Sequence, residues 1–309
     1  MAKSDKWSQW LAETRFGGDQ NAAEMQMRGL IKLRDRLLKK AGLSEGKVVL
    51  DVGAGEGMIG FGALELIGTS GRVILSDISE ALIERARAAA VQMGVLDRCS
   101  FVKASAEDLS TIESESVDLV TTRSVLIYVD DKPRAMHEFF RVLKPGGRTA
   151  LFEPIDDQRM TEYSQFWGGR IWSGPDSEEL APIRPLLKRL NDYWLQHRHV
   201  NEAMTNFNER DLLRMCIEAG LAGVHIELDL DAGPIPSMRW ETLMKSSGNP
   251  LIPTYEEVFV QIFSEEERAE LERHLRPTVE RGGRLWRSHG SFTWAFKAPI
   301  PEKPWPDDA

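Results

Sequence analysis

The chain has 309 residues, of which 28% are charged and 42% hydrophobic, as is ordinary for a globular protein. Its net charge of -9 and pI near 5.4 argue against a nucleic-acid surface, which normally carries a stripe of Lys and Arg. Neither a signal peptide nor an apolar run of spanning length is visible, and two cysteines are too few for a disulfide framework. We therefore expect a cytoplasmic protein without nucleic-acid or membrane partners.

The first predicted elements are a turn at residues 14–19 and a long helix over residues 21–41. The run Val48–Val52 is apolar on both faces and predicts a buried parallel strand. Three glycines follow at alternate positions, Gly53, Gly55 and Gly57, before a helix over residues 58–67. Glycines here permit a tight turn and let a ligand approach the backbone, and the amides that begin the helix would point at it. The segment predicts a nucleotide-like site.

Four further strands follow, in alternation with helical segments. They are expected at residues 72–76, ending at Asp77; within 98–108, ending in an Ala-Glu-Asp turn; at 117–122; and after Pro145-Gly146-Gly147, ending at Glu153. Helices are expected at residues 136–143, 183–195 and 265–275, and an alternating segment at 291–298 predicts a closing antiparallel strand. This order predicts an α/β fold with a doubly wound, mostly parallel sheet.

A glycine turn of this kind occurs in two families of nucleotide-binding proteins. Dinucleotide-binding dehydrogenases have G-x-G-x-x-G, whereas this chain has G-x-G-x-G, with Met58 in place of the third dehydrogenase glycine. Asp77 is placed to accept hydrogen bonds from ribose hydroxyls, which fits both families. The later motifs discriminate, because the Ala106-Glu107 turn and the Leu-Lys-Pro-Gly-Gly turn at 143–147 stand in order after the glycines.

Together these motifs resemble the class I S-adenosylmethionine-dependent methyltransferases, in particular their small-molecule branch. The resemblance covers about residues 45–155, with a looser echo at 208–230 and 291–298. It implies a Rossmann-like, seven-stranded sheet with helical lid insertions, S-adenosylmethionine as cofactor and methylation of a small molecule. Two other classes stay open: a non-catalytic or regulatory S-adenosylmethionine-binding protein on the same fold, and an NAD(P)-dependent oxidoreductase.

The resemblance also assigns cofactor-binding residues. Asp51 and the glycine turn would face the methionine moiety and ribose, Asp77 would bind the ribose diol, and Ile78 would pack on the adenine. Ala106 would offer its amide to the adenine ring, Glu107 or Asp108 would accept from the exocyclic amine, and the carbonyl near Arg123 would hold the ammonium. The chain departs from the family at Ser105, where an acid is frequent, and at Arg123, which puts a cation near a sulfonium.

The tryptophans mark insertions, since none falls between residues 11 and 166, which hold the cofactor motifs. We divide the chain into an N-terminal lid segment (1–44), a cofactor-binding core (45–153), a first insertion (154–207), a core continuation (208–231), a second insertion (232–290), and a closing strand with the tail (291–309). Insertions at these places lie beside the ligand cleft of this fold, which favours a substrate lid. The alternative is a packing or homodimer-contact subdomain whose tryptophans are core.

Candidates for substrate binding are Phe16, Trp167 and Arg170. Phe16 would close over the cofactor with the N-terminal helix, although a lone aromatic before a helix more often packs as a staple. Trp167 lies in a Trp-Gly-Gly turn of the first insertion. Arg170 could clamp a carboxylate such as a keto or amino acid, as could Arg15, Arg123 and Arg159.

Methyl transfer also needs a base if the acceptor carries a proton. Glu153 is the best candidate because it ends the fifth strand, Tyr128 follows the fourth strand, and His199 lies in the first insertion. The alternatives are an ion pair of Glu153 with Arg123 or Arg170 and a surface position for the histidine. No set of residues with metal-ligand spacing emerges. Oxygen, nitrogen and carbon acceptors all stay open.

Overall fold

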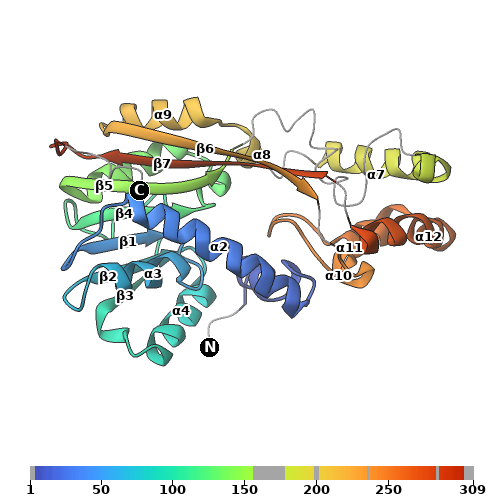
Figure 1. Ribbon diagram of the computed structural model, residues 1–309, viewed down its shortest axis with the longest axis horizontal. Coiled ribbons are helices and arrows are strands. Elements are labelled where there is room, and N and C mark those ends of the chain that lie inside the picture. Colours follow the sequence, from blue (N-terminus) through green and yellow to red (C-terminus); the bar gives the residue numbers. More distant parts are fainter. Residues whose placement is uncertain (1–3, 156–177, 198–201, 235–236, 283–284, 303–309) are drawn as a thin grey trace.

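The computed structural model describes residues 4–155, 178–197, 202–234, 237–282 and 285–302. Its centre is a seven-stranded sheet of order β3-β2-β1-β4-β5-β7-β6 (Figure 1). The strands are β1 (Val48–Val52), β2 (Arg72–Asp77), β3 (Cys99–Lys103), β4 (Val117–Arg123), β5 (Leu143–Pro154), β6 (Ala222–Pro234) and β7 (Leu285–Phe296). Strands β1 to β5 pair in parallel, and β7 is antiparallel to both β5 and β6. The predicted α/β fold class is confirmed.

The central strands form where the sequence has short apolar runs. Val49, Leu50 and Val52 of β1 are almost wholly buried, as parallel strands covered on both faces should be. The last two strands are longer than the sequence predicts, because the β6–β7 ladder continues to the pair Pro234–Leu285. The second insertion is correspondingly shorter than 232–290. The polar run Arg287–His289 conceals the start of β7, since the apolar pattern begins only at Phe292.

Helices cover the two faces of this sheet with separate hydrophobic clusters. On one face pack α2 (Gln20–Lys40), α3 (Met58–Leu66) and α4 (Glu80–Gln92), and on the other α5 (Lys132–Val142) and α9 (Glu209–Glu218). Each helix begins where the sequence supplies a cap. The Ser79 hydroxyl, for example, accepts a hydrogen bond from Leu82 N at the start of α4. The sheet is therefore a doubly wound three-layer structure.

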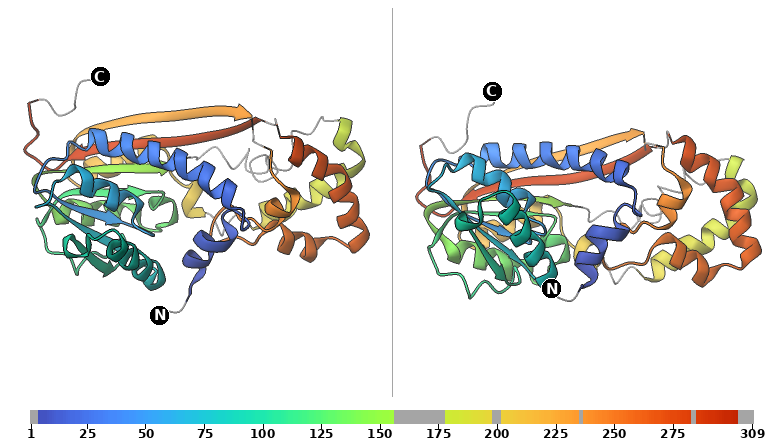
Figure 2. Two further views of the ribbon diagram at one scale, coloured as in Figure 1. Left: turned by 60° about the horizontal axis from the view of Figure 1, so that its bottom comes forward. Right: turned by 90° about the horizontal axis from the view of Figure 1, so that it is seen from below.

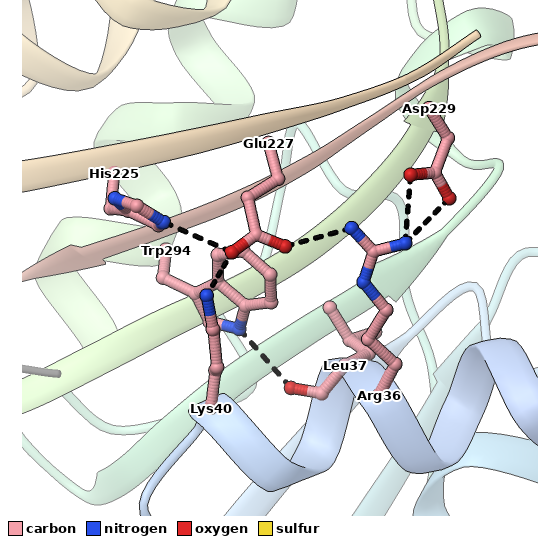
Figure 3. Close-up of polar contacts among 7 residues, drawn as sticks. All are labelled: Arg36, Leu37, Lys40, His225, Glu227, Asp229 and Trp294. Carbon is pink, nitrogen blue, oxygen red and sulfur yellow. Dashed lines mark hydrogen bonds and ion pairs between the residues drawn. The ribbon is translucent and has the colours of Figure 1, made fainter. Parts of the chain in front are cut away.

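Polar contacts fasten the carboxyl-terminal half of α2 to the outer strands (Figure 3). The Arg36 guanidinium pairs with Glu227 at 2.8 Å and with Asp229 at 2.7 Å, and Lys40 pairs with the same Glu227. The buried Trp294 indole donates to the Leu37 carbonyl at 3.1 Å. These contacts fix the direction in which α2 leaves the sheet, and so the position of the segment before it.

A helical subdomain lies beyond the ends of β6 and β7 (Figure 1). It comprises η4 (Glu178–Ile183), α7 (Arg184–Gln196), α10 (Trp240–Met244), α11 (Tyr255–Ile262) and α12 (Glu265–Arg281). Its helices share a hydrophobic cluster of their own, which includes Trp194 and Trp240, only 3% and 5% exposed. The two insertions thus meet in one helical unit, and these two tryptophans are core residues of it.

The N-terminal segment, residues 5–19, bridges the sheet domain and this subdomain (Figure 2). It contains α1 (Lys6–Gln9) and the π-helix η1 (Trp10–Thr14), and Asp19 caps α2. On the subdomain side, the Trp10 indole donates to the Ser247 carbonyl at 3.0 Å and Ser247 N donates to the Thr14 carbonyl at 2.8 Å. On the core side, the Trp7 ring meets Tyr128 edge to face, with centroids 4.9 Å apart.

Within the described ranges, no helix is both long and apolar enough to cross a bilayer.

Candidate active site

The candidate site lies at the carboxyl ends of β1, β2 and β4. Strand order reverses between β1 and β4, because β2 and β3 lie on one side of β1 and β4 and β5 on the other. In open α/β sheets, ligands bind at such a switch point, outside the carboxyl ends of the strands. Strand β6 runs in the same direction as β1, so this edge faces the helical subdomain (Figure 1).

The glycine turn after β1 depends on the absence of side chains. Gly53, Gly55 and Gly57 all have positive φ, at 65°, 57° and 92°. A Cβ on Gly53 would lie 2.4 Å from Val125 Cγ2, and one on Gly57 would lie 2.4 Å from the Phe61 ring. The turn is therefore both conformationally and sterically reserved for glycine.

Two buried aspartates hold this turn. The Asp77 carboxylate accepts from Gly55 N and from Ser79 N, both at 2.9 Å, so it ties the glycine turn to the start of α4. The Asp51 carboxylate accepts from Gly60 N at 2.8 Å, in the first turn of α3. Burial raises the pKa of Asp51 to about 7 and also raises the pKa of Asp77. Asp77 keeps lone pairs that can accept from ribose hydroxyls.

The residues expected at the adenine line the next loops. Ile78 follows Asp77 and is 47% exposed, so its apolar surface is available for stacking, whereas Ala106 is buried. The Glu107 carboxylate accepts from Asp131 N at 2.7 Å, and Asp108 accepts from Ser110 N at 3.1 Å. Both acids therefore cap neighbouring backbone, and their expected contact with the exocyclic amine is a proposal.

Glu153 is wholly buried and holds the loop that follows β4. Its Oε1 accepts from the Thr122 hydroxyl at 2.8 Å, and its Oε2 accepts from Val125 N at 2.9 Å. Desolvation raises its pKa to about 7. The loop needs such an anchor because Ser124 has a φ of 57°, a conformation that costs a non-glycine residue energy. In this geometry Glu153 positions the loop, and its role as a base stays a prediction.

Tyr128 lies in the loop after β4, and Phe16 lies in the N-terminal segment. Tyr128 is half-buried against Trp7, and burial raises the pKa of its phenol, which disfavours the phenolate. The Phe16 ring lies 5.1 Å from the Arg15 guanidinium. The sequence does not predict the contact of Trp7 with Tyr128. The sequence signal for this contact is the pair Trp7 and Trp10 in an otherwise polar N-terminal segment.

Three candidate residues lie outside the described residues: Trp167, Arg170 and His199. Their roles remain predictions. Among the residues that the structure does describe, no group of three or more His, Cys, Asp or Glu side chains is placed to hold a metal.

A doubly wound sheet with a glycine turn at its switch point defines a Rossmann-like nucleotide-binding protein. A family model described as "Methyltransferase domain" matches residues 43–197, which is half of the chain. The chain belongs to the class I S-adenosylmethionine-dependent methyltransferases. The cofactor that this family implies is S-adenosylmethionine, and the dehydrogenase alternative is set aside.

Curated relatives match the cofactor-binding part. The ubiquinone/menaquinone biosynthesis C-methyltransferase UbiE of Psychromonas ingrahamii is 34% identical over 122 residues, 37% of this chain and 48% of the relative. The protein of the same name from Marinomonas sp. is 34% identical over 116 residues, 38% of this chain and 46% of the relative. The chain thus spans about half the length of the curated relatives that it matches.

Two solved structures share the fold. A Bacillus halodurans C-125 protein described as a methyltransferase has a TM-score of 0.51 at 17% identity, covering 86% of this chain and 99% of its own. The YcgJ protein of Bacillus subtilis also has a TM-score of 0.51, at 15% identity, covering 89% of this chain and 99% of its own. At these identities the likeness shows the fold alone.

The described residues fit the implied cofactor. The glycine turn offers backbone without Cβ atoms, Asp77 offers a carboxylate beside it, and Ile78 offers an exposed apolar side chain for the adenine. Such a combination of bare backbone, ribose acceptor and stacking surface is what an adenosyl group requires.

Proposed function

We propose that this protein transfers a methyl group from S-adenosylmethionine to a small-molecule acceptor beneath the N-terminal segment and helical subdomain. The observation that supports this proposal best is the hydrogen bond from Gly55 N to the Asp77 carboxylate, at the switch point of the sheet. This arrangement joins the two parts of the chain that an adenosyl group touches in this family. Family membership adds the reaction type.

When bound, the cofactor supplies a methyl group on a positively charged sulfur, which an acceptor displaces in line. The chain's own residues have three tasks in that reaction. Gly53, Gly55 and Asp77 bind and orient the adenosyl group. Glu153 fixes the loop that carries Tyr128, and the N-terminal segment covers the glycine turn, where Leu11 comes close to Gly55. Covering the turn excludes water, which would compete with the acceptor.

The atom that accepts the methyl group depends on the part of the chain that contacts the substrate. The curated relatives are named as C-methyltransferases of quinone biosynthesis, and their likeness to this chain is confined to the cofactor-binding part. The helical subdomain belongs to the part that would contact the acceptor. We therefore propose a small-molecule acceptor, with oxygen, nitrogen and carbon as candidate atoms.

The experiment is a transfer assay with methyl-labelled S-adenosylmethionine and a small-molecule extract, followed by mass spectrometry of the labelled product. We expect label in a small molecule and stoichiometric formation of S-adenosylhomocysteine. Binding of the cofactor without transfer to any fraction would instead favour the regulatory alternative. Transfer of the label only to protein or RNA would contradict the small-molecule acceptor.

A further inference from the structure

Two arginines from distant parts of the chain lie at the candidate site, because the N-terminal segment that carries Arg15 contacts the loop after β4, where the Trp7 ring meets Tyr128. Arg123 is the last residue of β4, and Arg15 follows η1 in the N-terminal segment. Both are partly buried. Burial and then the nearby positive charge of Arg123 lower the pKa of Arg15 to about 10, and burial also lowers the pKa of Arg123. Two like charges thus lie near one another in a partly buried site.

Neither guanidinium has a hydrogen-bonding or ion-pair partner among the described residues. Arg15 packs instead against aromatic rings, 5.0 Å from the Trp10 centroid and 5.1 Å from the Phe16 centroid. The partly buried Arg141 shows the contrast, since it donates to Glu138 and to the carbonyls of Leu109 and Ile112. An arginine carries five N–H donors, so Arg15 and Arg123 keep donors for a ligand.

The carboxylates near Arg15 and Arg123 form hydrogen bonds or ion pairs with other groups. Arg123 is near Asp51 and Glu153, but these accept from the backbone of α3 and of the β4 loop. Arg15 is near Glu56, which pairs with Arg85 at 3.3 Å. No carboxylate among the described residues therefore accepts a hydrogen bond from Arg15 or Arg123.

We propose that Arg15 and Arg123 together bind the carboxylate of a flat organic acid, which is the methyl acceptor. This inference rests on the proposed function and names its substrate class. A guanidinium fork matches a carboxylate in shape and charge, and the rings of Trp10 and Phe16 offer flat apolar surface beside it. The cofactor adds a sulfonium, which makes an anionic acceptor more favourable still.

The reaction balances without a base. A lone pair of the acceptor carboxylate forms the new oxygen–carbon bond, the carbon–sulfur bond breaks, and its electron pair stays on sulfur. The negative charge of the acid and the positive charge of the sulfonium cancel, giving a neutral methyl ester and S-adenosylhomocysteine. No proton is removed. This agrees with a site in which Glu153 is engaged and burial raises the pKa of Tyr128.

The test uses three probes of almost one shape and different charge: benzoate, benzamide and benzamidine. Each is titrated calorimetrically into the full chain saturated with S-adenosylhomocysteine, for the wild type, Arg15→Gln, Arg123→Gln and the control Arg28→Gln, an exposed position on α2. We expect benzoate to bind at least about tenfold more tightly than benzamide and benzamidine. Arg15→Gln and Arg123→Gln should each weaken benzoate roughly tenfold and leave the affinity for S-adenosylhomocysteine within about threefold, and Arg28→Gln should behave as the wild type.

Failure of the acid-acceptor inference and failure of the proposed function give different results in this experiment. Equal binding of the three probes, or no binding of benzoate, overturns the acid acceptor and leaves the cofactor site intact. Weakened S-adenosylhomocysteine binding in both variants with unchanged benzoate binding also overturns it, because the pair would then hold the cofactor's own carboxylate. Failure of the wild type to bind S-adenosylhomocysteine overturns the proposed function itself and the acceptor inference with it.

Discussion

At the scale of single residues, Glu153 anchors the loop after β4, and its role as a base stays a prediction. Its position at the end of β5 aims it at the site, and this is what the sequence predicts. The loop after β4, however, turns its amides toward the same point, and the carboxylate accepts from Val125 N and Thr122 Oγ1. A buried carboxyl group with such partners stabilises the backbone of the loop.

We predict that Glu153→Gln keeps most of the methyl-transfer activity, because the amide can accept from Val125 N and donate to the Thr122 hydroxyl. Glu153→Ala should lose about 1–3 kcal/mol of unfolding free energy, since it leaves buried donors without partners. Initial rates of transfer and denaturant titrations measure both effects. A loss of activity of about a hundredfold or more in a folded Gln variant would instead favour the catalytic base.

The raised pKa of Glu153 also predicts a pH dependence. The folded protein holds the proton up to about pH 7, whereas the ordinary value is 4.5, so the carboxyl contributes stability that is present at low pH and lost as pH rises through about 7. Glu153→Gln should therefore lose less unfolding free energy than the wild type, by about 1–3 kcal/mol, between roughly pH 5 and pH 8. The exposed Glu65→Gln is the control and should follow the wild type. Parallel pH curves for Glu153→Gln and the wild type would contradict the buried, proton-holding carboxyl.

At the scale of elements, the N-terminal segment connects the site with the helical subdomain. Trp7 contacts Tyr128 of the core, and Trp10 and Thr14 bond to Ser247 of the insertion. Asp19 adds a bond from the Thr242 hydroxyl at 3.1 Å. The contacts of Arg36, Leu37 and Lys40 with the outer strands fix the position of α2 (Figure 3). They therefore also fix the point at which the N-terminal segment joins this helix. Movement of the subdomain would therefore displace the N-terminal segment that lies against the glycine turn.

We predict that Trp10→Phe loosens this connection, because it removes the hydrogen bond to the Ser247 carbonyl and keeps an aromatic ring beside Arg15. Losing one such bond is worth about 1 kcal/mol, so amides of residues 10–19 should exchange with solvent up to roughly tenfold faster. Mass-resolved hydrogen exchange measures this, with the exposed Gln9→Ala as the control. Unchanged exchange in Trp10→Phe would show that the segment is held without this bond.

At the scale of the whole molecule, the core could be predicted from the sequence because its signals are local. The run Val48–Val52 becomes β1 at the predicted residues, and Asp77 ends β2 beside the glycine turn. Contacts between distant segments could not be predicted. Trp7 and Tyr128 meet only because α2 and β4 are fixed by the fold, and the burial of Trp194 and Trp240 in the helical subdomain depends on two insertions meeting.

The central claim is that the edge formed by the glycine turn and Asp77 is an S-adenosylmethionine site. Calorimetric titration of S-adenosylhomocysteine and of NADH into the wild type and Asp77→Ala tests it most directly, with circular dichroism to check that the variant is folded. We predict saturable S-adenosylhomocysteine binding to the wild type, no binding of NADH, and affinity weakened at least about tenfold in the variant, since a charged hydrogen-bond acceptor is lost. Equal affinity of S-adenosylhomocysteine for the two proteins, or binding of NADH in its place, would contradict the assignment.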